Sequence, residues 1–138
     1  MFQNSLNRER LSMYLAIRTS DKISEIYLLD EKEIKKERKW EAGRELSKEL
    51  LTVIDNIIEH DFDSLKGLIV FAGPGSFTGL RIGVTTMNAL AYGKNLPIVG
   101  TTNEDWLEEG AKRLKLGEDD KMVIPEYGSE AHITLPKK

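Results

Sequence analysis

A glycine-rich turn between a strand and a helix is the part of this sequence best suited to bind a ligand. Residues 73–76 read Gly-Pro-Gly-Ser, directly after an apolar run and before twenty residues without proline. Free backbone N–H groups and the positive end of a helix dipole favour an anion at such a position. The candidate contacts for an anion or a nucleotide are Gly73, Gly75, Ser76 and Thr78.

The same turn also suits a purely structural role, which the pattern favours. The turn is not a Walker loop, because Leu80 follows Gly79 where the Walker motif has a lysine after its second glycine, and it is not GxGxxG. Ser76 is then expected to be a helix N-cap rather than a nucleophile, because GPGSFTG differs from the GxSxG pattern.

Metal and thiol chemistry have little support in this composition. The two histidines, His60 and His132, are far apart and have no ligand-like spacing around them. The chain has no cysteine, which removes disulfides, thiolate ligands and cysteine nucleophiles. We therefore predict no metal site, no cofactor and no catalytic residue.

The turn is expected to belong to a βαβ unit with two parallel strands, at 68–72 and 97–100, around a helix. On this helix Leu80, Val84, Met87 and Ala91 form the stripe that faces the core. A second stripe contains Gly79, Gly83, Thr86 and Leu90. Two interior glycines cost about 1 kcal/mol each relative to alanine. They indicate close backbone packing, either against this chain's own sheet or against a partner helix, and spacing alone leaves both open.

The remaining elements are predicted from periodicity and turn residues. Residues 1–11 are expected to be an N-terminal extension and 12–138 a single domain. Strands at 12–19, 23–29 and 32–40 would form an antiparallel meander. Helices are expected at 41–60 and 104–116, and short strands at 121–124 and 131–135. In the helix at 41–60, Leu51 and Ile58 widen the apolar stripe, which indicates either a second contact surface or deep burial.

The strand at 32–40 is rich in basic residues: Lys32, Lys35, Lys36, Arg38 and Lys39. One hypothesis is a patch that contacts RNA. The favoured interpretation is an edge strand that charge protects from pairing with other chains. The net charge of -3 also argues against nucleic-acid binding by bulk electrostatics. The absence of a spanning apolar run and of cysteine suits a cytoplasmic protein without membrane contact.

The segment GPGSFTGLRIG, residues 73–83, resembles the signature of the TsaB (YeaZ) family, whose members take part in making N6-threonylcarbamoyladenosine (t6A) on tRNA. The resemblance implies an α/β fold, one actin-like ATPase (ASKHA, ribonuclease H-like) lobe with a mixed five-stranded sheet. It also implies a non-catalytic scaffold subunit that pairs with the catalytic TsaD subunit. A TsaE-like ATPase would be a further partner, tRNA would be reached only through the complex, and the free chain would be a homodimer.

By this resemblance, two helices would form the interface with TsaD or with a second copy. The interface residues are Arg44, Ser47, Leu51, Ile54, Ile58, Gly79, Arg81, Gly83, Thr86, Met87 and Leu90. The chain departs from the family at the first strand, where members usually read IDTS and this chain has Ile17-Arg18-Thr19-Ser20. Arg18 removes a possible magnesium ligand. Gly43 and Arg44 also replace a frequent histidine-serine pair.

The chain is also shorter than family members, which continue into a second lobe. Residues 124–132, IPEYGSEAH, are similar to the segment that closes those proteins. We therefore expect a short form that retains a C-terminal tail strand without the second lobe. The alternative function is a nucleotide-binding enzyme of the same fold, kinase-like or peptidase-like, that uses the turn at Gly73. Arg18 argues against that alternative.

Overall fold

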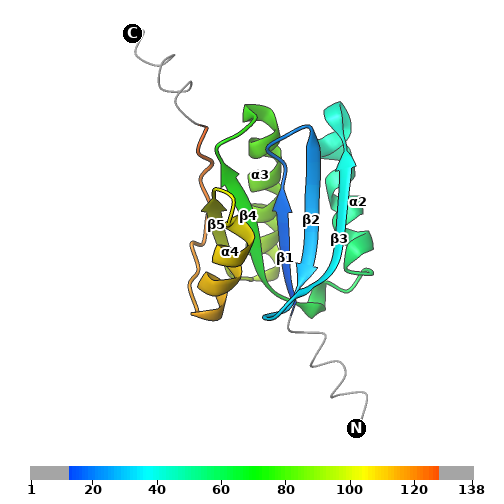
Figure 1. The fold of residues 1–138 in the computed structure, drawn as a ribbon. Helices are drawn as coiled ribbons and strands as arrows, with labels where there is room; N and C mark the ends of the chain where they lie inside the picture. Colours follow the sequence, from blue (N-terminus) through cyan, green and yellow to red (C-terminus); the bar gives the residue numbers. More distant parts are fainter. Residues whose placement is uncertain (1–12, 128–138) are drawn as a thin grey trace.

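The computed structural model describes residues 13–127, which form a mixed five-stranded sheet in the order β3-β2-β1-β4-β5 (Figure 1). The strands are β1 (Met13–Arg18), β2 (Ile23–Leu29), β3 (Ile34–Glu41), β4 (Leu65–Gly73) and β5 (Ile98–Thr102). The first three pair antiparallel, while β4 is parallel to both β1 and β5. The predicted meander and βαβ unit are thus confirmed. The expected extension at 1–11 and strand at 131–135 lie outside the described residues.

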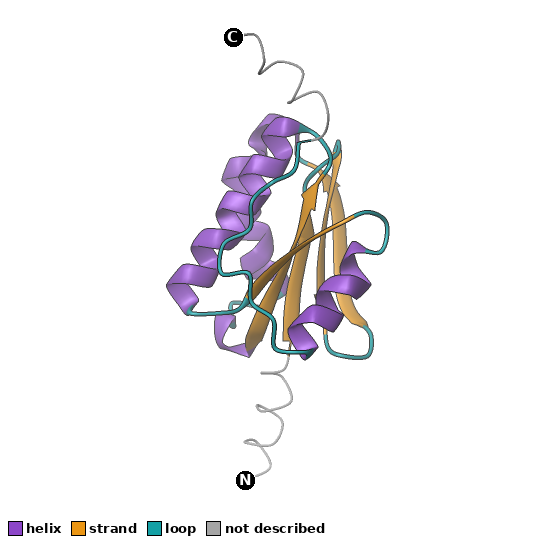
Figure 2. Cartoon of the chain, turned by 90° about the vertical axis from the view of Figure 1, so that its left-hand side faces the viewer, coloured by secondary structure: helices purple, strands orange, loops and turns teal. Residues whose placement is uncertain are grey.

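Three α-helices cover the two faces of this sheet (Figure 2). They are α2 (Leu46–Ile57), α3 (Phe77–Lys94) and α4 (Trp106–Lys115), and 3₁₀ turns at Gly43–Glu45 and Phe62–Ser64 precede α2 and β4. The helix predicted at 41–60 is shorter in the structure. Its first turn is 3₁₀ and contains Gly43 at a positive φ of 58°, and Glu59 and His60 adopt positive φ just after its end. Within residues 13–127, no helix is long and apolar enough to cross a membrane.

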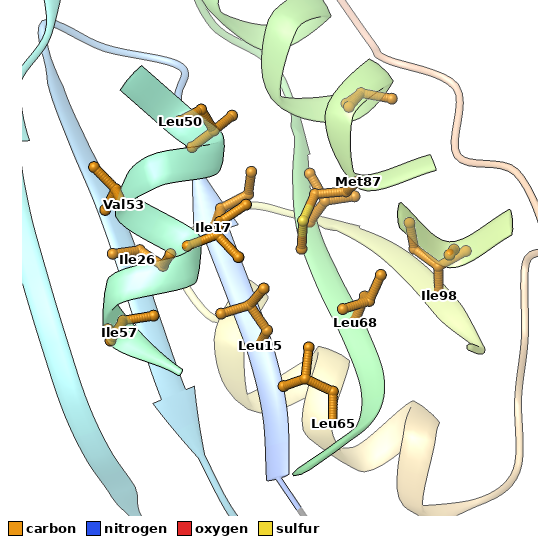
Figure 3. Packing of buried hydrophobic residues seen from close by; sticks show 14 of the residues in the cluster. Leu15, Ile17, Ile26, Leu50, Val53, Ile57, Leu65, Leu68, Met87 and Ile98 are labelled. Carbon is orange, nitrogen blue, oxygen red and sulfur yellow. The ribbon is translucent and has the colours of Figure 1, made fainter. Parts of the chain in front are cut away.

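Alternation along the strands builds two cores, one on each face of the sheet. Leu15 and Ile17 of β1 point toward α2 and α3, whereas Tyr14 and Ala16 point toward α4. The larger core lies under α2 and α3 (Figure 3) and includes side chains from four strands and both helices. The predicted inward stripes are confirmed there: Leu46, Leu50, Val53, Ile54 and Ile57 on α2, and Leu80, Val84, Met87 and Ala91 on α3.

The basic strand β3 is an edge strand, as the favoured interpretation of its charge predicted. Every residue of β3 except Trp40 is exposed, so both of its faces are open. Acidic residues balance part of its charge. Lys35 Nζ lies 3.0 Å from a carboxylate oxygen of Glu33, and Lys36 is ion-paired with Glu59. Charges on an exposed edge discourage pairing with another chain.

The opposite edge of the sheet is closed by the segment that follows α4. Asp119 and Asp120 lie beside β5, where their carboxylates accept hydrogen bonds from the amides of Ile98 (3.1 Å) and Gly100 (2.9 Å). The Asp120 amide also donates to the Ile98 carbonyl (2.8 Å). The Arg113 guanidinium on α4 holds the Asp120 carboxylate from the other side. These two carboxylates therefore accept the hydrogen bonds of β5 amides that a sixth strand would otherwise use for pairing.

The strand predicted at 121–124 is not formed, although its backbone is held firmly. The Asn88 side chain on α3 donates to the Val123 carbonyl (3.0 Å) and accepts from the Val123 amide (2.9 Å). A side-chain amide thus replaces the neighbouring strand that the prediction assumed. We call residues 118–127 the strap (orange in Figure 1), because they run from α4 past β5 to the top of β4, where the Glu126 amide donates to Ala72.

The strap gives a pH-dependent prediction. Burial alone would raise the pKa of the Asp120 carboxyl, but hydrogen bonds from Arg113 and from the Gly100 amide outweigh it and hold this pKa below its ordinary value. The Asp120 charge therefore stabilises the fold above the unfolded-state pKa, and this contribution is lost as the pH falls through the folded-state pKa. We expect Asp120→Asn to lower the free energy of unfolding at neutral pH by about 1–2 kcal/mol.

The difference in unfolding free energy between the wild type and Asp120→Asn should shrink as the pH is lowered below about 4. In this range the wild-type carboxyl is progressively protonated and loses the charge that stabilises the fold. Urea unfolding curves across the acid range measure this difference. Glu104→Gln is the control, since the Glu104 side chain is exposed and makes no hydrogen bond or ion pair with the other described residues. A deficit that stays constant throughout the acid range would contradict the role of the Asp120 charge.

Candidate functional site

The outer surface of α2 and α3 carries several of the residues that the sequence assigns to a partner. The two helices lie side by side on one face of the sheet (Figure 1). Leu51 is an apolar side chain that is 56% exposed, and Ser47 and Asp55 lie one turn before and one turn after it. We call this surface the α2–α3 face, and its exposed or half-buried members are Arg44, Ser47, Leu51, Thr86 and Leu90. The predicted interface residue Arg81 is exposed on the other flank of α3, beside Phe77, which contacts Tyr127 near the C-terminal end of the described chain.

Four of the predicted interface residues are buried inside the chain, Gly83 and three with large apolar side chains. Ile54 and Met87 are fully buried, and Ile58 is only 3% exposed. All three pack in the core under the helices, so their side chains do not form the outer surface. This corrects the expectation that Ile58 widens the apolar stripe toward a partner: of the two surplus residues, only Leu51 faces outward.

The two glycines of the second stripe are packed against this chain's own β1–β2 turn. A Cβ atom added to Gly79 would lie 2.1 Å from the Thr19 carbonyl oxygen, and one on Gly83 would lie 2.2 Å from Thr19 Oγ1. The Thr19 hydroxyl also donates a 2.7 Å hydrogen bond to the Gly79 carbonyl. Of the two alternatives that spacing left open, Thr19 takes the space that a partner helix would have used. Thr86 and Leu90 remain at the surface.

The glycine-rich turn is held by the same β1–β2 turn. Ser76 caps α3, accepting from the Gly79 amide (3.4 Å), and its own amide donates to the Ser20 carbonyl (2.8 Å). Gly73 has φ of 124°, and a Cβ there would meet the Glu126 carbonyl oxygen. Gly75 leaves no room for a side chain beside Ser20. Three of the four candidate anion contacts, Gly73, Gly75 and Ser76, therefore have a structural task, whereas Thr78 is exposed.

Arg18 stands at the end of β1, where the resemblance would place an acidic residue. Its guanidinium lies 4.1 Å from the centroid of the Phe71 ring, a cation–π contact. Its Nε atom donates to Ser20 Oγ (3.0 Å), and its terminal nitrogen lies 3.5 Å from Asp21. These contacts fix a positive charge at this end of the sheet. Among residues 13–127 there is no cluster of three or more histidine, aspartate or glutamate side chains that could hold a metal ion.

A large groove lies on the opposite face, between α4 and the β2–β3 hairpin. It measures about 880 Å³, and Tyr27 and Trp106 line it together with carboxylates such as Glu25 and Glu108. The Tyr27 hydroxyl donates to Glu25 (2.6 Å). Burial, and then this hydrogen bond, raise the pKa of Tyr27. Sequence reasoning missed this groove because its two walls lie far apart in the chain, and no motif links them.

Three comparisons relate this chain to known proteins. A family model described as tRNA N6-adenosine threonylcarbamoyltransferase (TsaD) matches residues 39–116, more than half of the chain. The tRNA threonylcarbamoyladenosine biosynthesis protein TsaB of Haemophilus influenzae is 32% identical over 96 residues, which cover 67% of this chain and 41% of that protein. The TsaB protein of Escherichia coli is 33% identical over 88 residues, which cover 57% and 38% respectively.

Among solved structures, YeaZ from Pseudomonas aeruginosa matches with a TM-score of 0.60 at 23% identity, over 67% of this chain and 44% of that chain. This likeness confirms the predicted fold, one α/β lobe of the actin-like ATPase type. The chain spans about two fifths of the length of the curated TsaB relatives it matches, 41% and 38%.

The glycine packing gives a testable prediction. Replacing Gly83 by alanine should lower the free energy of unfolding by about 1–3 kcal/mol, because the new methyl group overlaps Thr19 and the close-packed site must shift. The control is Gly93→Ala in the same helix, where nothing lies within 4 Å of the added atom. It should raise stability by up to about 1 kcal/mol.

Urea denaturation of both variants provides the measurement. Combining Gly83→Ala with Thr19→Ala should recover part of the loss, since the overlapping hydroxyl is then gone. If Gly83→Ala were as stable as the wild type, the space beside this glycine would not be needed by the fold.

Proposed function

This chain belongs to the tRNA N6-adenosine threonylcarbamoyltransferase (TsaD) family, in its TsaB (YeaZ) branch, and on that premise we propose that it is a non-catalytic scaffold subunit in t6A synthesis. Its task would be to pair with a TsaD-like catalytic subunit through the α2–α3 face. The observation that carries this proposal is Leu51, a leucine on α2 that is 56% exposed.

The composition of the α2–α3 face supports docking of another helical surface. Ser47, Thr86 and Leu90 are short or apolar and allow a partner helix to approach closely, while Leu51 supplies apolar area. Arg44 is exposed at the start of α2. Arg81 is exposed on the strap side of α3, 5.2 Å from the Phe77 ring centroid, and would pair with a carboxylate of the partner at the margin of the interface. Gly79, Gly83, Ile54, Ile58 and Met87 would support this surface from behind.

The positive charge at the end of β1 supports a role in which this chain has no catalytic centre. Arg18 puts a positive charge where the resemblance would place a metal-binding acid, and its contacts to Phe71 and Ser20 hold it there. The backbone of the glycine-rich turn is also engaged, since the Ser76 amide bonds Ser20. The alternative of a nucleotide-binding enzyme would need this turn to be open, so we favour the scaffold.

The wider assembly follows from the same proposal. A TsaE-like ATPase would be a further partner, and tRNA would be bound through the complex rather than by this chain alone. Without its partner, the chain would form a homodimer through the α2–α3 face, because exposed apolar surface favours association. A protein that serves tRNA modification would act in the cytoplasm.

We expect the chain, mixed with the TsaD-like protein of the same organism, to form a one-to-one species in size-exclusion chromatography with light scattering. Leu51→Asp should weaken this complex at least about tenfold, because a charge replaces apolar area in the centre of the interface. The fold should survive, since Leu51 is exposed.

Leu116→Asp is the matched control, because Leu116 is a 69% exposed leucine that follows α4, away from the α2–α3 face. It should bind the partner like the wild type. A wild-type chain that forms no complex would overturn the scaffold proposal. A complex that tolerates Leu51→Asp would move the interface to another surface.

A further inference from the structure

A small cavity lies between the N-terminal ends of α2 and α3. It measures about 220 Å³ and is set apart from the large groove on the other face of the sheet. Residues of β1–β2, of the start of α2 and of the first turns of α3 line it, among them Thr19, Ser24, Leu46, Ser76, Thr78 and Ile82. The cavity thus joins the α2–α3 face at its N-terminal end.

Ser24 is the unusual member of this lining. Its side chain lies on the same face of β2 as Ile26, and only 2% of the residue is exposed. No hydrogen bond of its hydroxyl is found within the described part of the chain, and the residue borders the cavity. The hydroxyl oxygen is not fully enclosed, unlike that of Tyr14, so it can be reached from the cavity. The hydroxyl is therefore available to a group that enters the cavity.

The electrostatics of the cavity favour a negative group. Thr78 lies in the first turn of α3, where amides have no acceptor inside the helix and the dipole is positive. The start of α2 faces the same space with Gly43 and Leu46. Asp21 and Lys22 at the rim carry opposite charges, and their neighbours are Arg18 (3.5 Å) and Glu41 (3.7 Å). Because the rim charges balance, the N-terminal ends of the helices determine the sign of the electrostatic potential in the cavity, which is positive.

The size of the cavity limits the occupant. Pockets for drug-sized ligands and cofactors hold about 300–1,000 Å³, so this cavity suits the end of a single side chain rather than a nucleotide. Its position on the α2–α3 face places it where the partner would dock. We propose that the partner subunit anchors here through one acidic side chain, whose carboxylate accepts hydrogen bonds from Ser24, Thr78 and the first-turn amides of α3. This inference rests on the proposed function and adds the chemistry of the contact.

Thr78→Asp tests the inference, because it puts a carboxylate at the place that the partner's carboxylate would take. Thr78 is exposed, and an aspartate in the first turn of a helix is stabilising, so the variant should fold. It should bind the TsaD-like protein at least about tenfold more weakly than the wild type. Leu116→Asp adds the same charge away from the α2–α3 face and should bind normally. Ser24→Ala, which removes the unpartnered hydroxyl, should weaken binding about threefold.

A titration of the chain alone with sodium acetate separates the two proposals. Acetate stands in for the acidic side chain, and it should shift the backbone NMR signals of Thr78 and Ser24 saturably in the wild type but not in Thr78→Asp. If acetate binds and no complex forms, the scaffold function fails and the carboxylate site stands. If the complex forms but Thr78→Asp binds like the wild type, or acetate causes no shift, the acidic anchor is overturned and the scaffold function stands.

Discussion

The contact between the β1–β2 turn and the first turns of α3 is the constraint on which the arrangement depends. Thr19 and Ser20 approach the helix so closely that Gly75, Gly79 and Gly83 can carry no side chain. Two hydrogen bonds, from Thr19 to the Gly79 carbonyl and from the Ser76 amide to Ser20, fix the distance. They hold the start of α3 against the end of β1. The sheet therefore determines the orientation of α3 and of its part of the α2–α3 face.

Both edges of the sheet have backbone N–H and C=O groups that could pair with another chain, and the two edges prevent this in different ways. β3 is not covered, and its charged side chains, lysines partly balanced by carboxylates, discourage such pairing. β5 is closed by the strap, whose Asp119 and Asp120 side chains occupy its amides. The strap also contacts α3 at two places. Its Val123 amide bonds the Asn88 side chain, and the Tyr127 ring packs against the Phe77 ring at the start of the helix, with 4.3 Å between the ring centroids. One segment thus seals an edge and braces the helix that carries the proposed interface.

Periodicity was sufficient to predict the elements whose structure depends on burial alone. The strand at Ile23–Leu29 and the inward stripes of α2 and α3 follow from alternation and from the 3.6-residue repeat. Contacts between distant segments were beyond such reasoning. Nothing local indicates that Asn88 bonds Val123 or that Thr19 fills the space beside Gly79. For Ile58 the periodicity left a second contact surface and deep burial both open, and the structure shows burial. The proposed site was therefore predicted by helix and by face, but only partly by residue.

The glycine-rich segment that carries the family resemblance has a structural explanation of its own. Its glycines make room for the β1–β2 turn, and its serine caps α3, so the segment can be retained where the chain performs no chemistry. Under the proposed function, the charge at the end of β1 is the feature that argues against an enzyme on this fold. Arg18, held on the Phe71 ring, puts a fixed positive charge where the family resemblance places an acidic residue. The same framework presents the α2–α3 face, so the proposed partner recognition would need no catalytic residue in this chain.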